Sequence, residues 1–250
     1  MALAAKATID VMASIFQASG RCVAISVTPS DGTGTRRVAP ILDIPSAMSA
    51  RPGDAIDDKT APAGEKAPPS HERIILCYFL TQAPARRLER LVHRHPVPGV
   101  TFHVFSSEPL ALPRGRAALS VVSHRKQRKL FQDLFATCEG VICSTGNETV
   151  WEAVCRGVPV LTIPTAGHGE QILNATVHAR ALPALVRTRG RLKLADVQWV
   201  AGTQPGSTEQ ARAESLALRT SCQALHAPGG VAEALSLDAS STSAESRARA

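Results

Sequence analysis

The sequence predicts an α/β fold built on a doubly wound parallel sheet. Short apolar runs alternate with helical stretches from residue 73 to residue 188. The apolar runs are continuous, which is typical of strands that are covered by helices on both faces. Clusters of Pro, Gly and small polar residues separate the segments, so each apolar run is bounded by a turn. We therefore expect a single Rossmann-like domain.

Each element is predicted from its own pattern. Strands are expected where apolar residues run without a break, and helices where apolar residues recur every three or four positions. In the basic segment 124–138, for example, Leu130, Phe131, Leu134 and Phe135 fall on one face of a helix. The expected strands are 73–80, 100–106, 119–123, 140–144, 160–164 and 184–188, and the expected helices are 83–95, 124–138, 147–156, 170–182, 193–201 and 207–225.

The composition divides the chain into three parts. Residues 1–70 are rich in Pro, Gly, Ser, Ala and Asp, so we expect an irregular N-terminal segment or linker. Residues 71–227 carry the predicted α/β domain. Residues 228–250 are polar and are expected to form a disordered tail.

Charge and composition argue against several classes of function. The formal net charge is +7, but the basic residues are scattered in short clusters and only 4% of residues are aromatic, which argues against a nucleic-acid-binding surface. The six cysteines have no CxxC spacing, which favours reduced core cysteines. No apolar stretch approaches the length of a transmembrane segment, and Asp10 interrupts any signal-peptide core. We expect a cytoplasmic protein without a metal site or a bound cofactor.

A small polar turn follows the expected strand 140–144. Gly146 permits close backbone approach, and the first amides of the next helix point outward with the positive end of the helix dipole. Such a turn suits a phosphate group, and the hydroxyls of Ser144, Thr145 and Thr149 add donors. The alternative interpretation is that Ser144 to Asn147 only cap the helix.

Two glutamates lie one helical turn apart after this turn. Glu148 and Glu152 share one face of the helix, so one of them lies near a ribose attached to a phosphate at the helix start. Dinucleotide-binding folds hold ribose hydroxyls with such a carboxylate. The alternative is a pair of solvated glutamates on an exposed face.

The junction after the strand 160–164 supplies a second polar cluster. A flexible loop with His168 and Gly169 leads into a helix that begins with Glu170 and Gln171 and continues to Asn174. A carboxylate, two amides and an imidazole can together satisfy several sugar hydroxyls. No second histidine or cysteine stands at metal-ligand spacing from His168.

Taken in order, the motifs of residues 130–180 resemble the donor-binding C-terminal domain of GT-B glycosyltransferases. The resemblance is to the family 28 enzymes, such as the N-acetylglucosaminyltransferase of peptidoglycan synthesis. The shared pattern is an apolar strand, a Ser/Thr/Gly turn, "T-x-x-E-A", "G-x-P", a strand that ends in Pro, and "E-Q-x-x-N-A". The resemblance implies a nucleotide-sugar donor site, with UDP as the family's usual nucleotide.

The resemblance also implies roles for individual residues. The implied positions are Thr145, Gly146 and Asn147 near the diphosphate, Glu152 on the ribose, Glu170 and Gln171 on the donor sugar, and His168 and Asn174 beside them. No catalytic residue is identified by this comparison.

The family pattern is not complete in this sequence. A GT-B enzyme also has an N-terminal domain that binds the acceptor, and residues 1–70 are too short and irregular for such a domain. A separate acceptor-domain subunit is therefore expected, as in the two-subunit N-acetylglucosaminyltransferase of the dolichol pathway, and such a partner could hold the chain at a membrane. Two alternatives stay open, namely a non-catalytic nucleotide-sugar-binding module and a truncated remnant of a longer enzyme.

Overall fold

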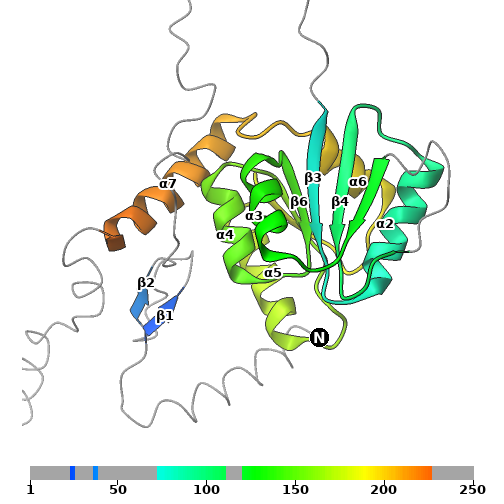
Figure 1. The fold of residues 1–250 in the computed structure, drawn as a ribbon. Helices are drawn as coiled ribbons and strands as arrows, with labels where there is room; N and C mark the ends of the chain where they lie inside the picture. Colours follow the sequence, from blue (N-terminus) through cyan, green and yellow to red (C-terminus); the bar gives the residue numbers. More distant parts are fainter. Residues whose placement is uncertain (1–22, 26–35, 39–71, 111–119, 227–250) are drawn as a thin grey trace, which may run out of the picture.

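The computed structural model describes residues 23–25, 36–38, 72–110 and 120–226. From Arg73 to His226, strands and helices follow one another in the order that the sequence predicts (Figure 1). The strands of the main sheet are β3 (Arg73–Tyr78), β4 (Val100–Phe105), β5 (Val121–His124), β6 (Gly140–Cys143), β7 (Val160–Thr162) and β8 (Val186–Thr188). The helices are α2 (Gln82–Arg94), α3 (Arg128–Thr137), α4 (Asn147–Cys155), α5 (Gly169–Ala181), α6 (Leu194–Gly202) and α7 (Glu209–His226).

Two short strands lie in the segment that the sequence predicts to be irregular. β1 (Val23–Ile25) pairs in parallel with β2 (Arg36–Val38). The other residues of segment 1–70 and the predicted tail 228–250 lie outside the described residues. The division of the chain into three parts therefore stays a prediction.

The main sheet is entirely parallel, which confirms the predicted fold class. Its strand order is β5-β4-β3-β6-β7-β8. The chain thus builds outward from β3 to β5 and then returns to the other side of β3 to continue from β6 to β8. This is the Rossmann-like order, and its reversal point lies between β3 and β6.

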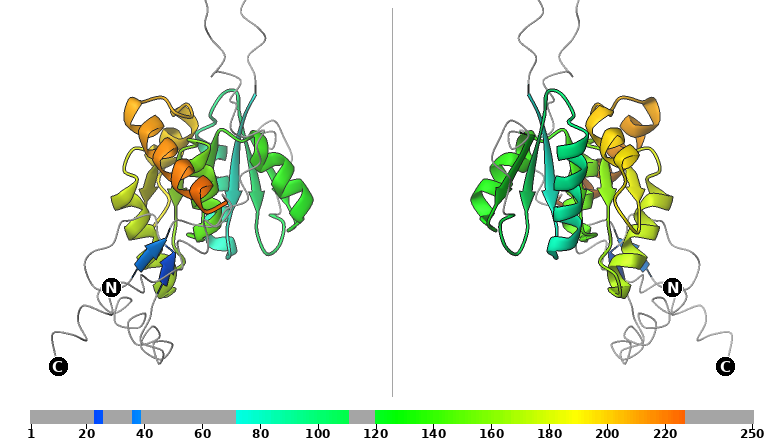
Figure 2. Two further views of the ribbon diagram at one scale, coloured as in Figure 1. Left: turned by 90° about the vertical axis from the view of Figure 1, so that its left-hand side faces the viewer. Right: turned by 90° about the vertical axis from the view of Figure 1, so that its right-hand side faces the viewer.

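Helices cover both faces of the sheet (Figure 2). Successive strand residues point to opposite faces, so Ile75 and Cys77 pack with α2 and α6, whereas Leu76 packs with α3, α4 and α7. Both faces are apolar because each strand is buried on both sides, which explains the continuous apolar runs in the sequence. α2 and α6 are thereby separated from α3 and α4 by the whole thickness of the sheet.

Local contacts fix α3 and α4 relative to each other. Arg156, at the end of α4, donates hydrogen bonds to the carbonyls of Phe135, Ala136 and Cys138 at the end of α3. α4 then ends in a Schellman motif at Gly157, whose φ is 65° and which leads the chain into β7. The two helices are therefore held side by side, with their N-terminal ends at the same edge of the sheet.

Candidate functional site

The reversal point of the sheet brings together two loops that lie far apart in the sequence. The Ser144 amide donates to the Tyr78 carbonyl (2.9 Å), and the Leu80 amide donates to Ser144 Oγ (3.2 Å). Beyond these bonds the two loops diverge, because α2 crosses to one face of the sheet and α4 to the other. Ligands of doubly wound folds bind in the crevice that forms at such a point.

A cavity of about 730 Å³ lies at this carboxyl edge, between the N-terminal ends of α3 and α4. We call it the edge cavity. The residues that line it are Tyr78, Phe105, Lys126, Gln127, Arg128, Phe131, Gly146, Asn147, Glu148, Thr149 and Glu170. Its volume lies within the usual range for small-molecule sites.

The N-terminus of α4 faces the edge cavity without a capping side chain. Gly146 occupies the N-cap position with an extended backbone, and no side chain of the described residues is recorded as accepting from the first amides of the helix. Ser144 Oγ is engaged by Leu80, whereas Thr145 Oγ1 and Asn147 Oδ1 are buried without a partner among the described residues. The structure therefore does not support the interpretation that Ser144 to Asn147 only cap the helix. The free amides are available to an anion at the cavity wall.

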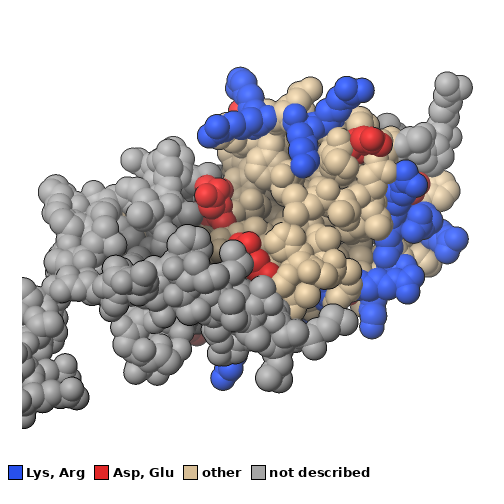
Figure 3. Space-filling view, turned by 90° about the horizontal axis from the view of Figure 1, so that it is seen from below, with Lys and Arg blue, Asp and Glu red and all other residues tan. Residues whose placement is uncertain are grey.

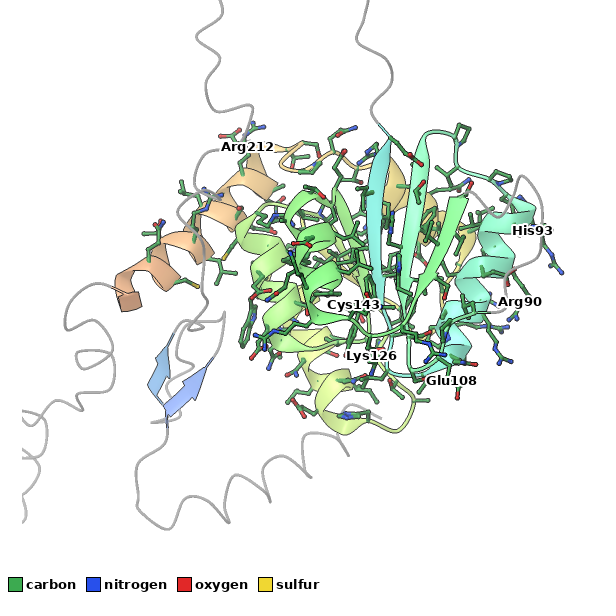
Figure 4. The ribbon with its side chains drawn as sticks, viewed as in Figure 1. Arg90, His93, Glu108, Lys126, Cys143 and Arg212 are labelled. Atoms are coloured by element: carbon green, nitrogen blue, oxygen red, sulfur yellow. The ribbon has the colours of Figure 1, made fainter. Side chains whose placement is uncertain are left out.

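The opposite wall adds a second helix N-terminus and two cations. α3 begins after Gln127, with no capping bond and no acidic residue in its first turn. Lys126 and Arg128 flank this residue and line the edge cavity. Lys126 lies near the end of the sheet in Figure 4, and Lys and Arg side chains gather along two sides of the carboxyl edge in Figure 3. Two helix dipoles and two basic side chains therefore favour a negatively charged group.

Aromatic rings form the apolar part of the cavity. Tyr78, Phe105 and Phe131 all line it, and Phe131 packs edge-on against the other two with ring centroids 5.6 and 5.4 Å away. Lys126 Nζ lies 5.5 Å from the centre of the Tyr78 ring. His124 stacks on Phe105 with ring centroids 4.7 Å apart. Burial lowers the pKa of His124 below its ordinary value, which favours the neutral ring at pH 7. A flat ligand can thus pack against rings at one end while its anionic part reaches the amides.

Three carboxylates lie on the α4 and α5 side. Glu148 and Glu170 line the edge cavity and are exposed. Glu152 is half-buried one turn further along α4 and is not among the residues that line the cavity. The structure thus places Glu148 closer to the cavity wall, and the assignment of the ribose to Glu152 stays a prediction.

The junction between β7 and α5 is held by its own polar side chains. Gln171 is buried, and its Oε1 accepts from the Thr165 amide (2.8 Å), so this side chain braces the loop. His168 is the N-cap of α5, where its Nδ1 accepts from the Gln171 amide (3.5 Å). Asn174 donates to Glu170 Oε1 (3.5 Å) on the exposed side of the helix. Glu170 is the member of this group that reaches the edge cavity.

The edge cavity gathers some of the residues that the sequence predicts and adds others. Four predicted residues line it, namely Gly146, Asn147, Thr149 and Glu170. Ser144 and Thr145 lie buried beneath the turn, and Gly169 begins α5. The residues that sequence reasoning missed are Tyr78, Phe105, Lys126, Gln127, Arg128 and Phe131. The signal for Lys126 to Arg128 was present, because a basic run directly after a parallel strand must lie at the carboxyl edge.

Other kinds of site find no support among the described residues. No group of three or more His, Cys, Asp and Glu side chains there is arranged to hold a metal ion. Burial raises the pKa of Cys143, at the end of β6, to about 12, so its thiol stays protonated in the core and is not an activated nucleophile. In the same part of the chain, no helix combines the length and apolarity needed to cross a membrane.

The chain is similar in fold to solved structures of glycosyltransferases. One is a UDP-glucosyltransferase from Polygonum tinctorium, described as capable of glucosylating indoxyl and solved with 3,4-dichloroaniline, with 16% identity and a TM-score of 0.54 over 85% of this chain and 52% of that chain. Another is the glycotransferase of kitacinnamycin, with 15% identity and a TM-score of 0.53 over 81% of this chain and 51% of that chain. The chain thus spans about half the length of these proteins.

Sequence comparison adds no closer relative. No protein-family model matches the sequence, and no curated protein matches it significantly. The likeness therefore concerns the fold, and it agrees with the strand order and the covered sheet. The described α/β unit has the fold of a single domain of a GT-B glycosyltransferase.

Proposed function

We propose that this chain binds a nucleotide-sugar donor, most simply a UDP-sugar, in the edge cavity and serves as the donor half of a glycosyltransferase that transfers a hexosyl group. The observation that carries the proposal is the convergence of two uncapped helix N-termini, Lys126 and Arg128 on a cavity at the reversal point of the sheet. The UDP-glucosyltransferase with the same fold supports the choice of nucleotide.

In this proposal, each part of the ligand meets a matching part of the cavity. The diphosphate lies against the amides of Asn147 to Thr149, with Lys126 and Arg128 opposite. The base packs in the aromatic part beside Tyr78 and Phe131, and a carboxylate of α4 accepts from the ribose. The sugar extends toward Glu170 at the start of α5, next to the loop that Gln171 braces.

The transfer step follows from this placement. An acceptor hydroxyl attacks the anomeric carbon, the bond from that carbon to the diphosphate breaks, and the nucleoside diphosphate leaves with the electron pair. The new charge develops where the α4 amides and the two cations already lie, and such preorganised donors lower the barrier. The proton of the acceptor goes to a base that we assign to a separate acceptor-binding subunit or domain.

A second candidate is a non-catalytic nucleotide-sugar-binding module. The observation that favours it is that the residues lining the edge cavity account for donor binding, whereas the base for the acceptor is assigned outside that cavity. Both candidates require donor binding, and they differ in whether product forms when an acceptor-binding partner is added. Transfer of the hexosyl group in such a reconstitution supports the glycosyltransferase. Binding of the donor without transfer and without hydrolysis supports the non-catalytic module.

Calorimetric titration with UDP, UMP and a UDP-sugar tests donor binding directly. We expect UDP to bind more tightly than UMP, and the double variant Lys126→Ala/Arg128→Ala to reduce that difference, because the second phosphate meets those cations. Titrations with TDP and GDP complete the series, and a chain that binds none of UDP, TDP and GDP would overturn the proposal.

A second series of variants distinguishes the roles of the two glutamates of α4. The variants Glu148→Ala and Glu152→Ala are titrated with UDP, and the one that contacts the ribose should weaken binding by about 1–3 kcal/mol. Glu209→Ala is the matched control, because Glu209 is also an exposed glutamate in the first turn of a helix but does not line the cavity. Equal affinity for all three variants would exclude ribose binding by α4.

A further inference from the structure

A second cavity lies beside the segment that joins β7 to α5. Its volume is about 400 Å³, and it is bounded by the start of α2, the β7–α5 segment and the loop between β8 and α6. We call it the arginine cavity, after Arg87, Arg90 and Arg191, which line it together with Pro84, Pro164 and Thr165. The edge cavity reaches α5 at Glu170, and no residue lines both cavities.

Three arginines converge on this cavity from two elements. Arg87 and Arg90 are three residues apart and so share a face of α2, and Arg191 comes from the β8–α6 loop. Arg90 lies on α2 in Figure 4. Arg87 Nε donates to the Leu192 carbonyl, which ties α2 to the loop and leaves the terminal nitrogens without a partner among the described residues.

Carboxylates do not neutralise these arginines in the described part of the chain. No Asp or Glu lines the cavity, and none pairs with Arg87, Arg90 or Arg191 there. Arginines elsewhere on the sheet behave differently, since Arg73 pairs with Glu139 and Arg189 pairs with Asp196, both at 2.8 Å. Three like charges held around one concavity repel one another, and an anionic ligand relieves that repulsion.

The remaining wall shows what else the ligand carries. Thr165 Oγ1 is buried without a hydrogen-bond partner among the described residues, and the Thr81 hydroxyl does not cap α2. Ala83, Pro84 and Pro164 add apolar surface next to these donors. The cavity therefore presents guanidinium groups and hydroxyls for an anion, and an apolar surface for an organic group bound to it. Guanidinium groups match phosphate oxygens with paired hydrogen bonds.

We propose that the arginine cavity binds a phosphate or diphosphate ester. The proposal stands on the cavity and its charges alone, and it does not depend on the proposed function.

The test is a titration of the full chain with inorganic pyrophosphate and with geranyl diphosphate, each in saturating UDP so that the edge cavity is filled. We expect both to bind, with geranyl diphosphate the tighter because its organic part meets the apolar wall. The variant Arg90→Ala/Arg191→Ala should weaken both by at least about tenfold. Arg86→Ala is the matched control, because Arg86 is an exposed arginine of α2 that does not line the cavity.

Each outcome decides one statement. Absence of pyrophosphate and geranyl diphosphate binding, or equal losses in Arg90→Ala/Arg191→Ala and Arg86→Ala, overturns the anion site. Equal affinity for the two probes overturns the proposal that the ligand is an ester, because the cavity would then bind free anions equally well. UDP affinity should be unchanged in Arg90→Ala/Arg191→Ala, and circular dichroism checks that the variant is folded. If UDP does not bind, the proposed function fails, and the same titrations without UDP still decide whether the arginine cavity holds a diphosphate.

Discussion

The Leu80 amide donates a hydrogen bond to Ser144 Oγ across 3.2 Å and joins the ends of two strands that are 64 residues apart. The bond lies at the point where the sheet reverses its winding. It fixes the turn that leads into α4, and therefore the direction of the α4 amides that border the edge cavity.

Replacing Ser144 should loosen this turn. Ser144→Ala removes the acceptor of the Leu80 amide from a buried position, and we expect a loss of about 1 kcal/mol in the free energy of unfolding. Urea unfolding followed by circular dichroism measures the change. Ser221→Ala is the control, because that hydroxyl donates to the Ala217 carbonyl on the exposed side of α7 and its loss should cost much less. Equal losses in the two variants would show that the bond does not stabilise the turn.

Gly140 is a close-contact position at the start of β6. A Cβ atom there would lie 2.6 Å from Val200 Cγ1 and 2.7 Å from Ile75 Cδ1, so β6 and α6 would have to move apart. We expect Gly140→Ala to lower the free energy of unfolding by about 1–3 kcal/mol, the usual cost of overpacking a core.

Gly202 provides the matched control for that substitution. It ends α6, and a Cβ atom there meets no heavy atom of the described residues within 4 Å. Gly202→Ala should therefore be close to neutral in thermal and urea unfolding. A Gly140→Ala protein as stable as Gly202→Ala would mean that the contact between β6 and α6 is not as tight as described.

His178 should make stability depend on pH. Burial against Trp151 lowers its pKa to about 4 from an ordinary value of 6.5. Below pH 6.5 the unfolded chain takes up a proton that the folded chain does not bind until about pH 4, so stability falls as the pH falls through this window. The loss should reach about 2–3 kcal/mol at the low end.

Urea unfolding at pH 7.5 and pH 4.5 measures this effect. His178→Phe should reduce the difference between the two stabilities, whereas His93→Gln, on an exposed position of α2, should leave it unchanged. His103 and His124 also have lowered pKa values and add to the loss in the same direction, so part of the difference should persist in His178→Phe. An unchanged difference in that variant would contradict the assignment.

The buried cysteines should resist alkylation. Cys77 and Cys143 are fully buried and free, and burial raises the pKa of both thiols, that of Cys143 to about 12. Iodoacetamide at pH 8 should modify their peptides at a small fraction of the rate seen in urea, as measured by mass spectrometry. A Ser221→Cys variant supplies an exposed reference thiol. Native-state labelling of Cys143 at the rate of that reference would contradict its burial.

The sequence by itself determined the order and type of the elements from Arg73 to His226. Each apolar run is continuous, as expected for a strand that is covered on both faces, and each helix has an apolar face of its own. The local patterns therefore agree with the fold. It also determined that the turn at Ser144 to Asn147 follows a strand, which in a parallel sheet places it at the carboxyl edge.

The lateral order of the strands and the resulting neighbours were decided by tertiary structure alone. The basic run at Lys126 was predicted as part of a helix, and its place beside Tyr78 and Gly146 depends on β5, β4, β3 and β6 being adjacent in that order. The same holds for Arg90 and Arg191, which are about a hundred residues apart and meet across one cavity. Periodicity reports only which face of an element is apolar. Long-range packing sets which elements lie side by side, and so which charges share a cavity.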